Sequence, residues 1–161
     1  MQFRHATLND LDELIRIENI GFSEEERASA EALRERINYI NDTFIILEDH
    51  GAIAGYINGP VISQRYITDD LFEHIDNNPE QGGYLSVLGV AVAPEYRNQG
   101  IAGRLLKYFE QLAQQHQRTA VTLTCKNELV SLYEYYGYIN EGVSESSHGG
   151  ITWYNLVKDV Y

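Results

Sequence analysis

The stretch from Val87 to Gly103 constrains the fold of this 161-residue chain more than any other. It reads V-L-G-V-A-V-A-P-E-Y-R-N-Q-G-I-A-G, in which an apolar, β-branched run ends at Pro94 and an amphipathic pattern begins near Gly100. Apolar runs rich in β-branched residues are typical of buried strands, and an apolar period of about 3.6 residues is typical of a helix. The stretch therefore predicts a strand that leads through a short polar turn into a helix.

The turn in this stretch has the features of an anion site. Arg97, Gly100 and Ala102 have the spacing R-x-x-G-x-A. The first N–H groups of a helix are unpaired and carry the positive end of its dipole, and glycine lets a phosphate approach the backbone closely. The turn thus indicates a phosphorylated cofactor, although any α/β protein has strand–turn–helix units with a glycine. The chain contains neither the dinucleotide motif G-x-G-x-x-G here nor the P-loop G-x-x-x-x-G-K-[ST].

Length and composition indicate one ordinary domain spanning residues 1–161. No run approaches the ~20 apolar residues of a membrane span, and the N-terminus M-Q-F-R-H-A-T has no secretory signal. A single cysteine, Cys125, excludes an internal disulfide, and the five histidines have no metal-binding spacing. We expect a cytoplasmic protein with no membrane partner and no bound metal.

The net charge of −12 is unevenly distributed. Residues 1–80 contain 17 acidic and 6 basic residues, a net of −11, whereas residues 81–161 contain 7 and 6, a net of −1. This balance disfavours nucleic-acid binding. The acidic half either attracts a cationic substrate or consists of solvated helix faces that favour solubility.

The hydrophobic pattern predicts an α/β fold, a mixed sheet with helices on both faces. Capping boxes at Thr7 with Asp10 and at Ser23 with Glu26 mark the first two helix starts. The expected helices are about 8–17, 23–40, 100–116 and 129–136, with a short one at 69–75. The expected strands are 3–7, 43–47, 52–58, 84–93, 119–125, 139–144 and 151–158.

A second motif follows the predicted strand 119–125. Residues 122–138 read T-L-T-C-K-N-E-L-V-S-L-Y-E-Y-Y-G-Y and contain the cluster L-Y-x-x-x-G-Y. Together with R-N-Q-G-I-A, this resembles the GNAT-type N-acetyltransferases, which use acetyl-coenzyme A, and the order of elements agrees over nearly the whole chain. Within that superfamily the chain looks most like the arylalkylamine (serotonin) N-acetyltransferase branch. That likeness is carried by E-N-I-G-F-S, which contains Phe22, by the insertion I-T-D-D-L-F-E-H-I-D-N-N-P-E-Q-G-G and by G-V-S-E-S-S-H-G-G-I-T-W-Y-N-L.

The resemblance implies roles for particular residues. In the family a bulged central strand presents its backbone to the pantetheine arm and the thioester carbonyl, and a tyrosine protonates the departing thiolate. That tyrosine corresponds to Tyr133 here. The strand positions are Val90, Ala91 and Val92, and the pyrophosphate positions are Arg97, Asn98, Gln99, Gly100, Ile101, Ala102 and Gly103.

The chain departs from the family pattern at the expected proton route. In the arylalkylamine enzymes two central-strand histidines relay the substrate proton through water, and Ser86 and Leu88 stand at those positions. Ser86 could order a water, and an acidic residue such as Glu24 or Glu25 could take the proton. Many GNAT enzymes also have an asparagine where this chain has Lys126. Asn127, one place further on, is the expected substitute for binding pantetheine.

The acceptor pocket is expected to have aromatic walls. Phe22 and Trp153 are the principal candidates for substrate contact, with Tyr66 and Phe72 as further ones, and ordinary core packing is the alternative. His148 in S-S-H-G-G is either a substrate-loop residue or a turn residue. Cys125 has no acid–base partner nearby in sequence, which favours direct transfer in a ternary complex over a cysteine acyl-enzyme.

The sequence thus predicts an N-acetyltransferase that moves the acetyl group of acetyl-coenzyme A to a small primary amine, of which an arylalkylamine is one form. A peptide or protein N-acetyltransferase is the second interpretation, and a non-catalytic coenzyme A-binding regulatory module is the third. The twelve tyrosines and the C-terminal strand make a homodimer plausible.

Overall fold

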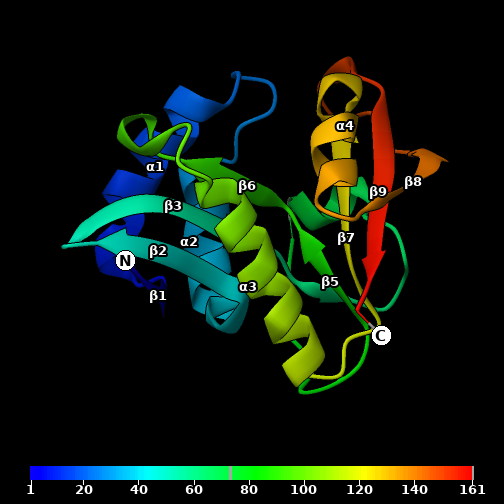
Figure 1. The fold of residues 1–161 in the computed structure, drawn as a ribbon, viewed down its shortest axis with the longest axis horizontal. Coiled ribbons are helices and arrows are strands. Elements are labelled where there is room, and N and C mark those ends of the chain that lie inside the picture. Colours follow the sequence, from blue (N-terminus) through cyan, green and yellow to red (C-terminus); the bar gives the residue numbers. More distant parts are fainter. Residues whose placement is uncertain (73, 161) are drawn as a thin grey trace.

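The computed structural model describes residues 1–72 and 74–160 of the chain (Figure 1). Its α-helices are α1 (Leu11–Gly21), α2 (Ala30–Tyr39), α3 (Ile101–Gln115) and α4 (Asn127–Tyr135). Its strands are β1 (Gln2–His5), β2 (Phe44–Asp49), β3 (Ala52–Asn58), β4 (Val61–Ile62), β5 (Tyr84–Val87), β6 (Gly89–Val92), β7 (Ala120–Lys126), β8 (Ile139–Val143) and β9 (Trp153–Asp159). The predicted mixed α/β architecture is confirmed, with the strands divided between two sheets.

The first sheet has the order β1-β2-β3-β6, and all of its neighbours are antiparallel. The second has the order β4-β5-β7-β9-β8, in which β5 and β7 are parallel and the other neighbours antiparallel. Because β5 and β6 are separated by the single residue Leu88, one run of chain passes from the second sheet into the first.

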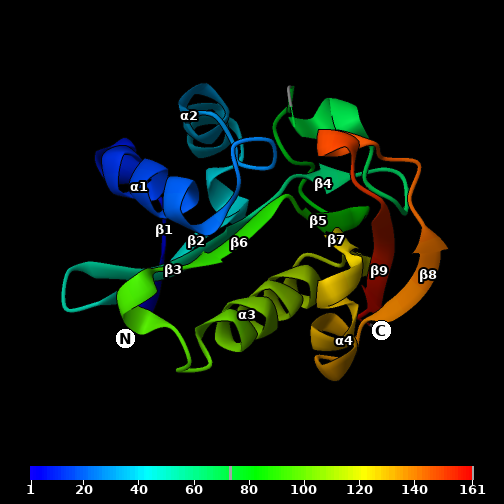
Figure 2. The ribbon, with the colours of Figure 1, turned by 90° about the horizontal axis from the view of Figure 1, so that it is seen from above.

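Helices cover the sheets from both sides. Figure 2 shows α1 and α2 on one face of the first sheet and α3 on the other, with α4 beside β7. Successive residues of β2 serve both layers, because Ile45 and Leu47 pack with α3 while Phe44 and Ile46 pack with α1 and α2. A strand buried on both faces reads as a continuous apolar run. This burial explains why β2 and β3 were predicted by apolar content and β-branching.

One of the two predicted helix starts is confirmed and the other is wrong. The capping box between Thr7 and Asp10 is present and opens a 3-10 turn that leads directly into α1. The helix predicted from Ser23 begins instead at Ala30, where the Ser29 side chain accepts a hydrogen bond from the N–H of Ala32. Both serines are good N-caps, and the first one closes only an isolated turn.

The insertion before the central strand is largely irregular. A short helix was expected at 69–75, and the structure has a 3-10 turn at Asp69–Phe72. Residue 73 of the expected helix lies outside the described residues. Among the residues that the structure describes, no helix combines the length and the apolar composition needed to cross a bilayer.

Candidate active site

The site begins where the central strand divides. The predicted strand 84–93 is two strands, β5 and β6, because the chain changes partner at Leu88. Hydrogen bonds from the N–H of Ser86 to the carbonyl of Pro60 (3.0 Å) and from the N–H of Leu88 to the carbonyl of Asn58 (2.9 Å) hold the dividing point against the end of β3. Hydrophobic patterning could not reveal the break, because both halves are equally apolar.

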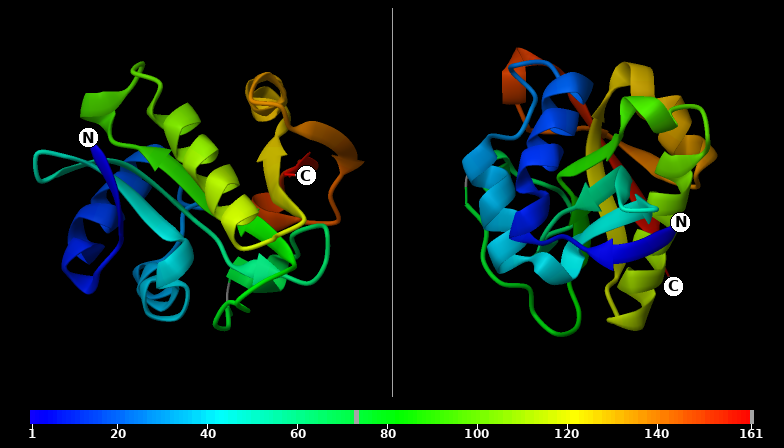
Figure 3. Two further views of the ribbon diagram at one scale, coloured as in Figure 1. Left: turned by 60° about the horizontal axis from the view of Figure 1, so that its bottom comes forward. Right: turned by 90° about the vertical axis from the view of Figure 1, so that its left-hand side faces the viewer.

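Beyond this point the two sheets separate (Figures 1 and 3). Strand β5 pairs with β7, whereas β6 pairs only with β3 among the described strands, from Gly55 opposite Val92 to Asn58 opposite Gly89. The edge of β6 that faces β7 therefore has backbone N–H and C=O groups without a partner strand. Such an edge can pair with an extended, amide-containing ligand in the manner of an added strand.

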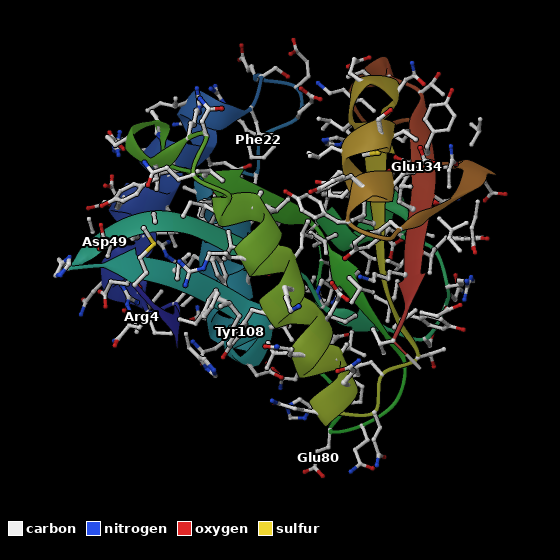
Figure 4. The ribbon with its side chains drawn as sticks, viewed as in Figure 1. Arg4, Phe22, Asp49, Glu80, Tyr108 and Glu134 are labelled. Atoms are coloured by element: carbon white, nitrogen blue, oxygen red, sulfur yellow. The ribbon has the colours of Figure 1, made fainter. Side chains whose placement is uncertain are left out.

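A cavity of about 210 Å³ lies in this opening. It collects residues from six segments that are far apart in the sequence: the end of α1, the insertion, the dividing strand, the end of β7, α4 and the segment from 146 to 153. In Figure 4 the Phe22 side chain projects from the loop after α1 toward this space. The residues that line the cavity include Phe22, Glu26, Phe72, Leu88, Gly89, Cys125, Lys126, Tyr133, His148 and Trp153.

Tyr133 is buried in the wall of this cavity and is 7% exposed. Its ring packs edge-on against Tyr138 with 5.9 Å between ring centroids, and its hydroxyl makes no hydrogen bond within the described residues. Burial, with smaller contributions from Cys125 and Tyr136, raises its pKa well above the ordinary value. The phenol therefore keeps its proton at neutral pH and presents it to whatever occupies the cavity.

Cys125 shows how the surroundings of the cavity affect the pKa of a thiol. Burial is the main cause that raises the pKa of its thiol to about 11, with smaller effects from Glu128 and Glu134. A thiolate formed in the same surroundings binds a proton more strongly than it would in water. Burial therefore strengthens proton binding by a leaving thiolate and by the Tyr133 phenoxide alike, and it keeps the Tyr133 proton in place until a thiolate is released beside it. It also makes Cys125 a poor nucleophile, because the thiolate is the reactive form.

The anion site predicted at 97–103 has the expected geometry at its glycine. Gly100 is the N-cap of α3 with φ of +74°, and a Cβ there would meet nothing within 4 Å. Asn98 also has a positive φ, of 64°. The first backbone bond of the helix runs from the N–H of Arg104 to the carbonyl of Gly100, so the N–H groups before it point out of the helix end. A phosphate fits such an end.

Gly103 is a glycine for a different reason. A Cβ at this position would lie 2.9 Å from Cε1 of the Tyr136 ring, which is tighter than side chains tolerate. Tyr136 follows α4, so the absence of a side chain at Gly103 lets α3 and α4 approach one another. The predicted contact of Gly103 with a pyrophosphate remains a prediction, and close packing of the two helices already requires this glycine.

Not every predicted substrate residue faces the opening. Phe22 and Trp153 line the cavity. Ser86 is fully buried, its hydroxyl donates to the carbonyl of Pro60 at 2.6 Å, and it lines neither cavity, so its expected contact with substrate stays a prediction that this geometry does not support. Asn127 is exposed at the start of α4 and lies outside the lining.

Two charged residues that were not among the predicted site residues line one side of the cavity. Nζ of Lys126 lies 3.0 Å from Oε1 of Glu26, joining the loop before α2 to the start of α4. Burial by itself would raise the pKa of Glu26, but hydrogen bonds from Ser23 and Lys126 and the Lys126 charge together lower it. Glu26 is therefore ionised at neutral pH. Glu24 and Glu25, the predicted proton acceptors, are exposed and line neither this cavity nor its neighbour.

A second cavity, of about 300 Å³, adjoins the first on the side of α1 and α2. The two share Phe22, Glu26, Phe72, Leu88 and His148 in their walls. The far wall of the second cavity contains Glu18 of α1 and Arg36 of α2, both buried. No sequence signal distinguished these two from other charged residues of amphipathic helices.

Aromatic rings form much of the common wall. The rings of Phe72 and His148 stack with 5.0 Å between centroids, and the Trp153 indole N–H donates to the backbone carbonyl of His148 at 2.8 Å. Tyr66, which was also expected in this wall, lies elsewhere, and its hydroxyl donates to Glu141 at 2.7 Å. No group of three or more histidine, cysteine, aspartate or glutamate side chains within residues 1–72 and 74–160 is arranged to hold a metal ion.

Solved structures with the same fold include one with a bound acyl-CoA. The GphF GNAT-like decarboxylase in complex with isobutyryl-CoA has a TM-score of 0.82 and 20% identity, covering 100% of both chains. The loading GNATL domain of CurA from Lyngbya majuscula has a TM-score of 0.81 and 22% identity over 99% of this chain and 97% of that one. Ribosomal-protein-alanine N-acetyltransferase from Brucella melitensis has a TM-score of 0.67 and 20% identity over 99% of each chain.

At the level of sequence, no curated protein matches the chain. The profile of the acetyltransferase (GNAT) domain matches residues 20–160, which include the divided strand, the α3 turn and Tyr133. This match spans most of the chain and agrees with the fold and with the open edge of β6. The chain therefore belongs to the acetyltransferase (GNAT) domain family.

Proposed function

We propose that this acyltransferase moves the acetyl group of acetyl-CoA to a small primary amine, by direct attack while both substrates are bound. The observation that carries the proposal is the Tyr133 hydroxyl, which is buried, protonated and without a hydrogen-bond partner among the described residues, in a cavity at the open edge of β6. Acetyl-CoA supplies the activated thioester. Tyr133 supplies the proton that a departing thiol needs.

The backbone of the divided strand is suited to hold the thioester end. The N–H groups of β6 on its open edge can polarise a carbonyl without any reorganisation, because the strand is fixed by β3 on its other side. The amino end of α3 and the turn at Gly100 are suited to the pyrophosphate. Residues 90–92 and 97–103 thus hold opposite ends of one ligand.

The adjoining cavities favour a small acceptor over a peptide. The Glu26–Lys126 ion pair joins the loop before α2 to the start of α4 across the cavity wall, and a peptide acceptor would have to pass beside it. The rings of Phe22, Phe72 and Trp153 suit an aromatic amine. These walls support the arylalkylamine form of the proposal. The open alternative is a peptide acceptor, as in the ribosomal-protein-alanine enzyme of the same fold.

A thiol-release assay with acetyl-CoA tests the function. We expect turnover with arylalkylamines such as 2-phenylethylamine, and little with N-terminal peptides. Turnover with peptides alone would favour the peptide acetyltransferase. Tight acetyl-CoA binding without turnover on either class would favour a non-catalytic coenzyme A-binding module.

Changing Gly100 to valine should weaken acetyl-CoA binding by about tenfold or more. A β-branched residue at φ of +74° is strained by about 1–3 kcal/mol, and relief of that strain displaces the turn from its place at the start of α3. Isothermal titration measures the effect. Gly51→Val is the matched control, because Gly51 also has a positive φ (+87°) and open space around it but lies in the β2–β3 hairpin. Equal affinities in the two variants would contradict the assignment.

Changing Glu26 to glutamine should raise the KM for a cationic amine by about tenfold. Glu26 is ionised and lines both cavities, so it is placed to attract the ammonium form of the acceptor and to receive its proton through water. Glu24→Gln and Glu25→Gln carry the same charge change at exposed positions of the same loop and should leave KM unchanged. A KM that moves equally in all three variants would indicate only long-range charge steering.

A further inference from the structure

Arg36 is the least satisfied charged group near the site. Its side chain is 3% exposed, and its one hydrogen bond within the described residues runs from Nη1 to Oδ1 of Asn58, at 3.1 Å. A guanidinium carries five N–H donors, so most of them have no protein acceptor. Arg36 nevertheless lines the second cavity, which is where an acceptor can be supplied.

Asn58 holds Arg36 in place. It is completely buried, it lines neither cavity, and its Nδ2 has no hydrogen-bond partner within the described residues. A Cβ built on Gly89 would lie 3.8 Å from that nitrogen and 3.9 Å from Nη1 of Arg36. Both side chains therefore lie close to the first residue of β6, next to the dividing point at Leu88. The buried guanidinium donors that Asn58 does not accept are costly unless a ligand in the second cavity satisfies them.

The charge at this place also lacks a close counterpart. Glu18, the buried carboxylate of the same wall, already accepts hydrogen bonds from the Tyr56 hydroxyl at 2.5 Å and the N–H of Ala28 at 2.8 Å. It lies beyond the 4.0 Å of an ion pair with Arg36, although its charge is felt there. Burial lowers the pKa of Arg36, and electrostatic interactions with Glu18, Tyr56 and Glu35 oppose that shift. A carboxylate from a ligand in the second cavity would be stabilised by the remaining donors of Arg36.

We propose that Arg36, held in place by Asn58, forms a carboxylate-binding site beside the acyl end of the cosubstrate. The shared chemistry is a planar carboxylate, which matches the fork of a guanidinium. One source is the acceptor itself, an amino acid whose ammonium group faces Glu26 and whose carboxylate faces Arg36. The other is the far carboxylate of a dicarboxylic acyl group such as malonyl. The first source rests on the proposed function and narrows its substrate to α-amino acids.

The experiment compares ligand pairs that differ only in the carboxylate. Kinetics are measured with L-phenylalanine against 2-phenylethylamine, and binding with N-acetylphenylalanine against N-acetyl-2-phenylethylamine by titration in the presence of coenzyme A. A second arm titrates malonyl-CoA against acetyl-CoA. The kinetic measurements and both sets of titrations are made on the natural protein, on Arg36→Met and on Arg36→Lys. Arg34→Met is the matched control, since Arg34 is exposed on the same helix.

We expect the natural protein to favour the carboxylate member of one pair by about tenfold or more, the size of a charge-assisted pair of hydrogen bonds. This discrimination should vanish in Arg36→Met, shrink in Arg36→Lys and persist in Arg34→Met. The pair that shows it identifies the source of the carboxylate. The titrations are independent of turnover, so a carboxylate preference without acetylation of either amine would overturn the proposed function and leave this site standing.

The inference is overturned if the natural protein discriminates in neither pair. It is also overturned if discrimination survives in Arg36→Met, or if Arg36→Met weakens both members of each pair equally, which would show a structural role. Thermal unfolding of each variant is measured alongside. Should Arg36→Met fail to fold, the natural protein's discrimination and its change in Arg36→Lys decide the question.

Discussion

Replacing Tyr133 with phenylalanine should lower kcat by about two to four orders of magnitude, the usual contribution of a positioned general acid. The change removes only the hydroxyl that lines the cavity beside Cys125 and keeps the ring that packs on Tyr138. Affinity for acetyl-CoA should change little, because the binding groups lie on β6 and at the start of α3. Initial rates of thiol release at saturating substrates measure the loss.

Tyr138→Phe is the matched control for that experiment. The Tyr138 hydroxyl is buried and has no hydrogen-bond partner among residues 1–72 and 74–160, and Tyr138 does not line the cavity. Its removal should leave kcat within about a factor of two and should not lower the free energy of unfolding, since an unsatisfied buried polar group is lost. Full turnover of Tyr133→Phe at neutral pH would remove this tyrosine from the mechanism.

Replacing Gly59 with alanine should destabilise the protein by more than about 3 kcal/mol, beyond the usual cost of overpacking. A Cβ at this position would lie 1.8 Å from the carbonyl oxygen of Ser86 and 3.0 Å from the backbone nitrogen of Leu88. Neither atom can rotate away, because both belong to the backbone at the dividing point. The two sheets would have to move apart there. Denaturant unfolding, or loss of soluble protein, measures the effect.

Gly21→Ala is the control for stability. A Cβ at Gly21 would meet nothing within 4 Å, and the residue lies in the last turn of α1, where alanine is the better helix former. Its free energy of unfolding should stay equal or rise slightly. If Gly59→Ala were as stable as this control, the close contact between Gly59 and the dividing strand would not exist in solution.

The sequence predicted the elements well where burial is simple. The apolar runs of β2, β3 and β7 and the amphipathic pattern of α3 appear close to the expected bounds, because their residues face a core on one or both sides. It failed at Ser23, where a good N-cap begins no helix, and at Leu88, where one apolar run changes sheets. The local hydrophobic pattern indicates which residues are buried, but it does not indicate which strand pairs with which.

The site was predicted in part, and for a related reason. Tyr133 and the turn at Gly100 belong to short motifs whose residues lie near each other in the chain, so the resemblance could place them. Glu26 was assigned only to a capping box, Lys126 only to the place of an expected asparagine, and Arg36 to no motif. They became candidates only when the fold brought the loop before α2, the end of β7 and the face of α2 around the dividing strand.

By itself, the sequence determined that a strand leads through a glycine turn into a helix, and that a tyrosine motif accompanies it. These features are local, because dihedral preferences and apolar periodicity act over a few residues. The tertiary structure alone decided that the strand divides at Leu88, that the Ser86 hydroxyl donates to Pro60, and that Arg36 is buried beside Gly89 with donors that no described residue accepts. Burial, charge pairing and hydrogen-bond satisfaction depend on residues far away in the chain. For this reason the cofactor turn and the aromatic residues Phe22 and Trp153 could be chosen from the sequence, whereas the charged residues of the acceptor side emerged only from the fold.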